Sequence, residues 1–268
     1  MHPLIGPFEP LKIELFSLPG FGPLTIYSFG VLVAFGFWAG AEVARRRASA
    51  HQLDPEVINR LIGYLVLGTF VGGHLGHALM YEPEVYLKNP IELLKVWDGL
   101  SSYGGFVACT LLTWWFFRVR ERVPFWPYAD VVAYGLPLGW MFGRLGCFSV
   151  HDHAGTATEF WLGVYGMCPD KPDTVACHDL GLYEAIYSAI MFGIFVVLGR
   201  KPRFSGFFVG WMAVLYGPLR LLLDVFRHPD TDARYFGFTP AQYLSVLVTA
   251  LGVAILLKRR GEDAPAAR

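Results

Sequence analysis

Apolar segments long enough to cross a membrane recur along the whole chain, separated by short polar stretches. Each runs for roughly 17–22 residues, the length that a helix needs to span a hydrocarbon core of about 30 Å. We place these segments at 24–43, 61–81, 100–117, 131–149, 182–198, 204–226 and 239–257. The pattern predicts an all-α polytopic membrane protein with seven transmembrane helices in a single membrane domain, 1–268. The longer segment 150–181 predicts a small cap on the outer side.

The composition supports this prediction. Hydrophobic residues make up 54% of the 268 residues and charged residues only 16%, whereas about a quarter of a soluble domain is charged. A soluble enzyme or binding module is therefore excluded. No basic patch or repeat indicates a nucleic-acid partner.

Most basic residues fall on one side of the predicted bundle, in the first, third and fifth loops and the tail. They are Arg45, Arg46, Arg47, Arg60, Arg118, Arg120, Arg122, Arg200, Lys201, Arg203, Lys258, Arg259, Arg260 and Arg268. The positive-inside rule then places the C-terminus in the cytoplasm and the N-terminus outside. Segment 1–22 lacks a basic start, so we interpret it as an interfacial entry segment rather than a signal peptide.

Two of the four cysteines, Cys168 and Cys177, lie in the predicted cap. An oxidising compartment would permit a disulfide between them, and two free thiols in a loop are the alternative. Cys109 and Cys147 fall in predicted spans, where cysteine commonly serves as a small buried residue.

Arg144 and Arg220 lie inside predicted spans, where an unsatisfied charge costs several kcal/mol. Both spans enter from the cytoplasmic side, near Asp130 and Phe204. At about 1.5 Å per residue, Arg144 lies roughly 21 Å and Arg220 roughly 24 Å into the membrane. Two helices thus carry arginine to similar depths, which predicts a shared functional site.

Around Arg220, the spacing of Tyr216, Asp224 and Arg227 places all four residues on one helix face. Asp224 can pair with either arginine, and a structural ion-pair ladder between helices is one interpretation. Counting Arg144, however, the arginines outnumber Asp224. A guanidinium fork suits bidentate capture of a phosphate, and the natural phosphate at that depth is a phospholipid headgroup.

Glycines and histidines allow further interpretations. Gly104 and Gly105 follow Tyr103 directly and could leave room for a ligand, although small residues also let helices pack closely. His151, Asp152 and His153 could contribute to a metal site, but no metal-binding motif is present and a His-x-His in a loop is usually solvated.

The segments around both arginines resemble the prolipoprotein diacylglyceryl transferase family. Gly143-Arg144-Leu145-Gly146-Cys147-Phe148, followed by Asp152 and Gly155, looks like that family's Gly-Arg-x-Gly-Asn-Phe signature. Tyr216-Gly217-x-x-Arg220-x-x-x-Asp224-x-x-Arg227 is similar to its Tyr-Gly-x-x-Arg-x-x-x-Glu-x-x-Arg segment. Further partial matches are Trp97-Asp98-Gly99, Ser101-Ser102-Tyr103-Gly104-Gly105, and His178 with Leu182-Tyr183-Glu184.

The chain departs from the family's pattern at several polar positions. Tyr103 replaces a histidine, Cys147 replaces the asparagine of the signature, and Asp152 and Asp224 replace glutamates. The arginines expected to bind the phosphate, Arg144, Arg220 and Arg227, all match the family's pattern.

The resemblance implies that the diacylglyceryl group of phosphatidylglycerol is transferred to the lipobox cysteine of a prolipoprotein signal peptide, releasing glycerol phosphate. It implies catalytic roles for Arg220, Arg144, Asp152, Asp224 and Tyr103. It implies phospholipid binding by Arg144, Arg220, Arg227, Tyr216, Gly104, Gly105, Gly155 and Cys147. Tyr103 would orient the headgroup, and Asp152 or Asp224 would take the thiol proton.

The implied setting is the bacterial inner membrane, with membrane lipid as surroundings and with no metal, organic cofactor or nucleic acid. Two alternatives stay open. One is a phospholipid-handling enzyme with another acceptor, and the other is a non-catalytic lipid-binding paralogue.

Overall fold

The protein is described by a computed structural model over residues 3–9, 12–18, 22–80, 82–94, 99–169, 171–228 and 234–262. The chain falls into two compact units. Unit 1 combines Met1–Val43 with Ala133–Arg268, and unit 2 is Ala44–Val132. The single domain expected over residues 1–268 stays a prediction.

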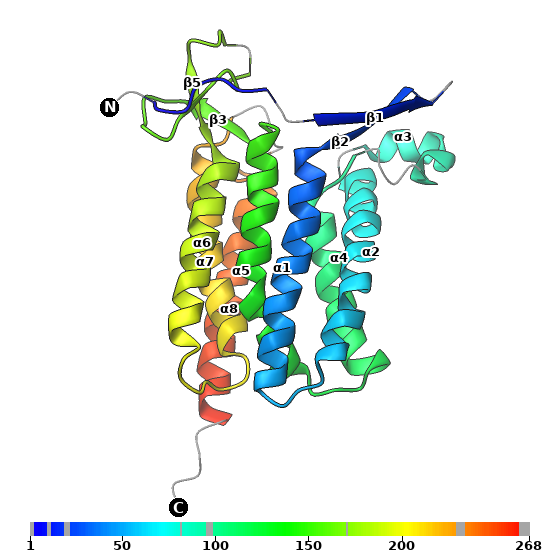
Figure 1. Cartoon of the computed structure of the whole chain (residues 1–268), viewed down its shortest axis with the longest axis vertical. Coiled ribbons are helices and arrows are strands. Elements are labelled where there is room, and N and C mark those ends of the chain that lie inside the picture. Colours follow the sequence, from blue (N-terminus) through cyan, green and yellow to red (C-terminus); the bar gives the residue numbers. More distant parts are fainter. Residues whose placement is uncertain are drawn as a thin grey trace, which may run out of the picture. The chain divides into compact units, whose positions relative to one another are not determined.

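Unit 1 is built from long helices. They are α1 (Ser28–Ala50) and α5 (Phe125–Ser149), which both continue into unit 2, and α6 (Leu180–Leu198), α7 (Phe207–Val225) and α8 (Pro240–Glu262). Helices α5 to α8 run along one another, and strands β3 and β5 lie at one of their ends (Figure 1). This bundle carries the arginine-bearing segments.

Small residues allow the helices of unit 1 to pack closely. A Cβ atom at Gly36 in α1 would lie 2.6 Å from the carbonyl oxygen of Gly139 in α5. A Cβ atom at Gly217 in α7 would lie 2.1 Å from Thr249 Oγ1 in α8. Since no side chain fits at either position, glycine sets the distance between these helix pairs, as is common in lipid.

An antiparallel hairpin precedes α1. Strand β1 (Lys12–Leu18) pairs with β2 (Gly22–Tyr27), with Lys12 opposite Tyr27 and Leu18 opposite Gly22. The first predicted span, 24–43, is therefore helical only from Ser28 onward. The polar–apolar alternation at the start of β1 is typical of a strand, and the interfacial location expected for segment 1–22 stays a prediction.

The segment predicted as a cap contains a three-stranded antiparallel sheet in the order β3 (Ala154–Ala157), β5 (Ala176–Asp179), β4 (Val164–Tyr165). Cys168 and Cys177 form a disulfide with their Cα atoms 5.4 Å apart. The two sheets correct the all-α prediction, because strands stand beside the helices.

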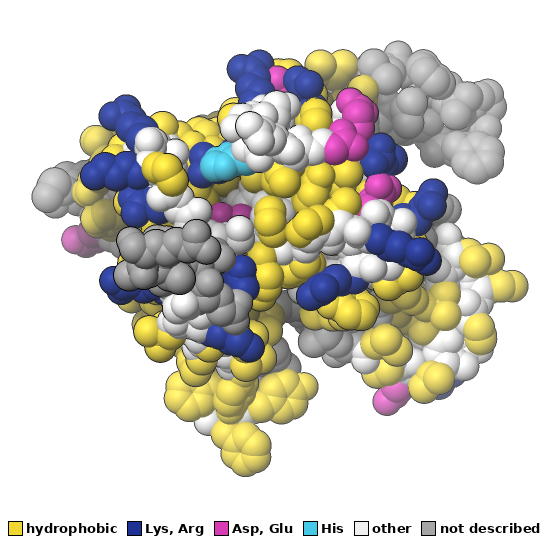
Figure 2. All heavy atoms as spheres, turned by 90° about the horizontal axis from the view of Figure 1, so that it is seen from below, with side chains coloured by type: hydrophobic (Ala, Val, Ile, Leu, Met, Phe, Trp, Pro, Cys, Tyr) yellow, Lys and Arg dark blue, Asp and Glu magenta, His cyan; other side chains and the backbone are white. Residues whose placement is uncertain are grey.

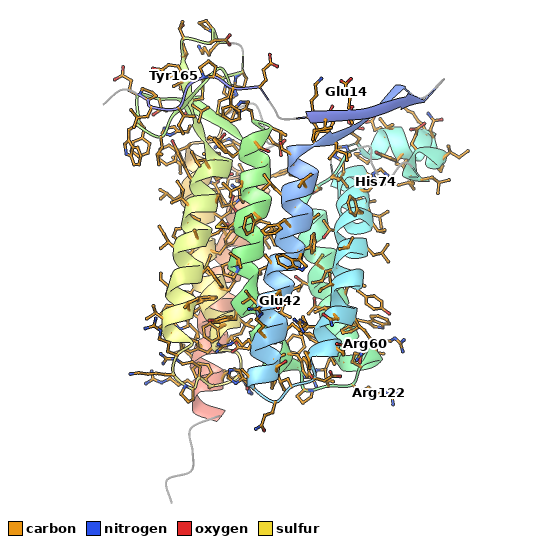
Figure 3. The ribbon with its side chains drawn as sticks, viewed as in Figure 1. Glu14, Glu42, Arg60, His74, Arg122 and Tyr165 are labelled. Carbon is orange, nitrogen blue, oxygen red and sulfur yellow. A yellow bond between two sulfur atoms is a disulfide. The ribbon has the colours of Figure 1, made fainter. Side chains whose placement is uncertain are left out.

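Unit 2 contains α2 (Pro55–Met80), α3 (Pro83–Lys88), the 3₁₀ helix η1 (Pro90–Leu94), α4 (Ser102–Trp115) and the π turn η2 (Phe116–Arg120). Arg60 and Glu121 form a bidentate ion pair with N–O distances of 2.9 and 2.7 Å. In Figure 3, Arg60 and Arg122 lie toward one end of this unit and His74 toward the other.

Five helical segments among the described residues are long and apolar enough to cross a membrane. They are Pro55–Leu79, Phe125–Ser149, Leu180–Leu198, Phe207–Val225 and Ala241–Gly261. The α-helical part of α4 ends after 14 residues, and the last turns of α1 carry Glu42 and three consecutive arginines. The protein is thus a mostly helical, polytopic membrane protein, and the seven-span arrangement stays a prediction.

The two ends of unit 1 differ in character. Glu14 and Tyr165 lie toward the end that carries the strands, and Glu42 lies toward the other (Figure 3). Figure 2 looks onto that second end and shows Lys and Arg side chains among apolar ones. The exposed Arg200 and Lys201, between α6 and α7, belong to this end.

Candidate functional site

Three helices of unit 1 contribute buried charges to one cluster. Arg144 comes from α5, Glu184 from α6, and Arg220 and Asp224 from α7, and each side chain belongs to a residue at most 8% exposed. The carboxylate of Glu184 interacts electrostatically with both Arg144 and Arg220. The structure therefore brings together the two arginines that the sequence places at similar depth.

The guanidinium group of Arg144 is held on several sides. Its Nε lies 3.2 Å from Glu184 Oε2, and its Cζ lies 4.8 Å from the centre of the Trp140 ring. Its Nη1 lies 3.1 Å from His153 Nε2. These partners satisfy most of the charge and fix the plane of the group.

Glu184 is the central acceptor of the cluster, and the sequence analysis did not select it as a site residue. Trp140 Nε1 donates to Glu184 Oε1 at 2.9 Å, and the Tyr216 hydroxyl donates to the same oxygen. A signal for this residue was present, because Glu184 is an acid inside an apolar span. The reasoning that selected Arg144 applies to it equally.

Asp224 anchors the other two arginines, as its spacing predicts. Its Oδ1 lies 3.9 Å from Arg220 Nη2 and 3.9 Å from Arg227 Nη1. Its Oδ2 accepts a hydrogen bond of 2.5 Å from the Thr239 hydroxyl, just before α8. This fully buried carboxylate is therefore held by partners within unit 1, while its Oδ1 accepts no hydrogen bond among the described residues.

Gly155 lets β3 approach the end of α7. A Cβ atom at Gly155 would lie 2.6 Å from the carbonyl oxygen of Phe226. Thr156 N donates to that same oxygen at 2.8 Å, and Gly155 forms a β-bridge with Arg227. The glycine thus fixes the backbone from which Arg227 reaches Asp224.

We define the arginine cluster as Arg144, Arg220 and Arg227 with the carboxylates Glu184 and Asp224. Three guanidinium groups face two buried carboxylates, which leaves one positive charge. A third acid, Asp152, interacts electrostatically with Arg144 and Arg227, but its side chain is 56% exposed. A structural ladder would need no such excess, whereas an anionic ligand would balance it.

Cys147, Asp152 and His153 offer donor atoms that all lie within 4.8 Å of one another, a spacing that a metal ion could use. His153 Nε2, however, lies 3.1 Å from Arg144 Nη1, and Cys147 Sγ lies 3.9 Å from the same nitrogen. A cation there would stand against a guanidinium group, and like charges at such distances repel strongly in a buried site. The group therefore suits proton handling better than metal binding.

The contact between His153 Nδ1 and Asp152 Oδ2, at 3.1 Å, dominates the electrostatics of Asp152. It lowers the pKa of Asp152 below its ordinary value, against the opposing effect of burial. Asp152 is therefore an anion at neutral pH, beside a buried histidine. His153 was not among the predicted site residues, because a His-x-His in a loop was interpreted as solvated.

The remaining predicted site residues lie in unit 2. A Cβ atom at Gly104 would lie 2.2 Å from the carbonyl oxygen of Gly72 in α2, whereas one at Gly105 would meet only ordinary contacts, from 3.5 Å. Gly104 thus allows α4 to pack on α2. The side chain of Tyr103 and the matching residues Trp97 and Asp98 lie outside the described part of the structure, so their predicted roles stay predictions.

Comparisons with known proteins point to one family. A family model described as prolipoprotein diacylglyceryl transferase matches residues 15–258. A phosphatidylglycerol–prolipoprotein diacylglyceryl transferase of Tolumonas auensis is 32% identical over 260 residues, covering 96% of this chain and 97% of the relative. The proteins of the same name from Solidesulfovibrio magneticus (35% identical; 94% and 95% covered) and Chromohalobacter salexigens (31%; 97% and 96%) are similar over nearly their whole length.

Proposed function

Since the chain belongs to the prolipoprotein diacylglyceryl transferase family, we propose that the arginine cluster is its catalytic centre. The protein transfers the diacylglyceryl group of phosphatidylglycerol to the lipobox cysteine of a prolipoprotein signal peptide. The product is a thioether, and glycerol phosphate leaves.

One observation carries this assignment to the cluster. Three arginines meet at one place in unit 1, where Arg144 and Arg220 are buried and Arg227 is partly buried, and two buried carboxylates leave one positive charge among them. The phosphate of phosphatidylglycerol carries one negative charge and would balance this excess. A guanidinium group presents paired donors that match phosphate oxygens, so Arg144 and Arg220 are suited to hold it.

The same arginines suit the chemical step. The thiol sulfur attacks the glyceryl carbon that is bonded to the phosphate ester, a carbon–sulfur bond forms, and the carbon–oxygen bond breaks. The bonding electrons move onto the phosphate oxygen, whose growing charge Arg144 and Arg220 stabilise at fixed positions. Glu184 and Asp224 hold these arginines in place before the substrate binds.

The other predicted residues take supporting roles. Tyr216 and Cys147 contact Glu184 and Arg144 respectively, and Gly155 fixes the backbone at Arg227. Tyr103, Gly104 and Gly105 are assigned to the headgroup by the resemblance alone. Of the two carboxylates considered as base, Asp224 is fully buried and paired with Arg220 and Arg227, which favours the more exposed Asp152 as the carboxylate near the thiol proton.

The proposed setting is the bacterial inner membrane, with seven spans, a periplasmic N-terminus and a cytoplasmic C-terminus. The basic residues between α6 and α7 and at the end of α8 support this orientation through the positive-inside rule. The disulfide between Cys168 and Cys177 supports an oxidising, periplasmic location for the cap at 150–181.

The proposal is tested with purified protein in nanodiscs that contain phosphatidylglycerol labelled in its diacylglyceryl group. A lipobox peptide serves as the acceptor, and Arg144→Ala and Arg220→Ala are compared with Arg200→Ala, a change at an exposed residue between α6 and α7. We expect each of the first two variants to lose at least about 100-fold in rate, as when a preorganised charge-stabilising group is removed. We expect Arg200→Ala to match the wild type.

The outcomes separate the alternatives. Full transfer by both buried-arginine variants would refute the catalytic role of the cluster. Phospholipid turnover without any lipobox peptide would indicate an enzyme with another acceptor. Phosphatidylglycerol bound at the cluster without product, under any acceptor, would indicate a non-catalytic lipid-binding protein.

A further inference from the structure

His153 occupies a fixed place immediately beyond α5. The chain turns sharply after the helix, with His151 at a positive φ of 55° and with Asp152 N donating to Cys147 O at 3.1 Å. The carbonyl oxygen of His153 accepts from Leu180 N at 3.1 Å, at the start of α6. The ring therefore stands on a backbone that is tied to α5 and α6, two of the three helices of the cluster.

The two ring nitrogens of His153 have different partners. Nε2 lies 3.1 Å from Arg144 Nη1, and Nδ1 lies 3.1 Å from Asp152 Oδ2. Arginine can only donate, so Nε2 must present its lone pair to Arg144. Nδ1 then carries the proton and faces the carboxylate. This tautomer has its basic nitrogen directed at the arginine cluster.

Burial also favours the neutral form of this ring. The pKa of His153 lies below its ordinary value, with burial as the largest cause, while Asp152 acts in the opposite direction. The lone pair on Nε2 is therefore available at neutral pH. A proton accepted there would give an imidazolium beside Arg144, whose repulsion the carboxylate of Asp152 and the phosphate of the bound lipid would offset.

A sulfur atom already lies beside this pair. The Sγ atom of Cys147, the ring of His153 and a carboxylate oxygen of Asp152 fall within 4.8 Å of one another. The spacing places the Cys147 sulfur next to the histidine and next to Arg144. The acceptor cysteine of the substrate needs a comparable position when it attacks the glyceryl carbon.

We infer that His153 is the general base of the transfer, with Asp152 as the residue that orients it. When Arg144 turns its donors to the phosphate of the bound lipid, Nε2 is released and accepts the proton of the acceptor thiol. The sulfur forms its bond to the glyceryl carbon, and the carbon–oxygen bond to phosphate breaks. The imidazolium later returns the proton to the released glycerol phosphate or to water. This inference rests on the proposed function.

The alternative bases are less well matched to a thiol. An ordinary thiol lies about 4 to 5 pKa units above a carboxylate and about 2 above an imidazole. The pKa values of Asp152 and His153 are both lowered, so the imidazole stays the closer match. Proton transfer is most effective when donor and acceptor are close in pKa. Asp224 is fully buried, is paired with Arg220 and Arg227, and accepts a hydrogen bond from Thr239.

The test compares His153→Gln with His151→Gln in nanodiscs of phosphatidylglycerol with a lipobox peptide. His151 is the matched control, because its Nε2 contacts Phe8 O at 3.0 Å, a hydrogen bond that a glutamine amide can also make. We expect His153→Gln to lose about 10²–10⁴-fold in kcat at pH 7, with unchanged phosphatidylglycerol affinity. We expect His151→Gln to behave as the wild type.

The pH profile separates a base from a positioning residue. The loss in His153→Gln should shrink as pH rises through the thiol pKa, near 8.5, because the thiolate then forms without a base. A loss that is equal at every pH, or no loss, would overturn the inference. Asp152 raises the pKa of His153. Asp152→Asn should therefore shift the acidic limb of the pH–rate profile to lower pH. An unshifted acidic limb would also overturn the inference. If the wild type makes no thioether product, the proposed function fails instead.

Discussion

Glu184 provides the sharpest test of how the arginine cluster is held together. It is 1% exposed, it forms an ion pair with Arg144, and it accepts hydrogen bonds from Trp140 and Tyr216. Replacing it with glutamine keeps the size of the side chain and one amide oxygen for Trp140 and Tyr216. The change removes the charge, so it isolates the electrostatic contribution of this carboxylate.

The magnitude follows from the geometry. At the 3.2 Å between Arg144 Nε and Glu184 Oε2, the Coulomb attraction is about 5 kcal/mol at an effective dielectric constant of about 20. Loss of one partner leaves the other charge buried, which typically costs 3–5 kcal/mol. Because glutamine retains the neutral hydrogen bonds, we expect Glu184→Gln to lower the free energy of unfolding by about 3 kcal/mol.

The assay is reversible unfolding in mixed micelles, arranged as a double-mutant cycle with Arg144→Gln. The double variant carries no buried charge at this pair, so we expect it to be about 3 kcal/mol more stable than the sum of the single changes predicts. Glu159→Gln, at an exposed position, is the control and should change stability by less than about 0.5 kcal/mol. Additive effects in the cycle would refute the electrostatic account of the pair.

Three further predictions concern stability. Gly36→Ala should lower the free energy of unfolding by about 1–3 kcal/mol, because its Cβ would lie 2.6 Å from a carbonyl oxygen of α5; Gly193→Ala, with nothing within 4 Å, should not. Reduction of the Cys168–Cys177 disulfide, which joins residues nine apart in sequence, should cost about 2–3 kcal/mol. Burial raises the pKa of Asp179 to about 6, so the folded state binds the extra proton and stability should fall as pH rises from about 4 to about 6. Asp179→Asn should flatten this dependence and, because asparagine also caps helices well, stabilise the protein at pH 7 by about 2 kcal/mol.

Thermal unfolding followed by circular dichroism measures all three effects. Equal midpoints for Gly36→Ala and Gly193→Ala would contradict close packing of α1 on α5. An unchanged midpoint on reduction would contradict a stabilising disulfide. A wild-type midpoint that does not fall between pH 4 and pH 6, or a profile unchanged in Asp179→Asn, would contradict the raised pKa of Asp179.

The positions of several residues of the arginine cluster were predicted from the sequence where a single rule was decisive, whereas their catalytic roles stay predictions. The cost of charge in lipid selected Arg144 and Arg220, and helical spacing placed Asp224 beside Arg220 and Arg227, as the structure has them. The same rule was not applied to Glu184, although an acid within an apolar span is equally costly. Its partners lie on α5 and α7, and pairing between different helices cannot be worked out from spacing within one helix.

The strands and the role of His153 were not predicted from the local pattern of the sequence. The alternating start of β1 was a usable signal for the hairpin Lys12–Tyr27, whereas β3 and β4 are only four and two residues long. The role of His153 depends on a turn that directs its ring back to Arg144. The orientation of a histidine ring in a polar loop cannot be predicted from the sequence alone.

The central claim is that this chain transfers a diacylglyceryl group by means of its buried arginines. It is tested most directly in a bacterium depleted of its own transferase, with the wild type or Arg220→Ala as replacement and with mass spectrometry of a prolipoprotein cysteine. The account predicts that the wild type restores growth and the thioether-linked diacylglyceryl group, while equally abundant Arg220→Ala restores neither. A correctly inserted wild type that leaves the cysteine unmodified, or an Arg220→Ala variant that modifies it at the wild-type level, would contradict the account.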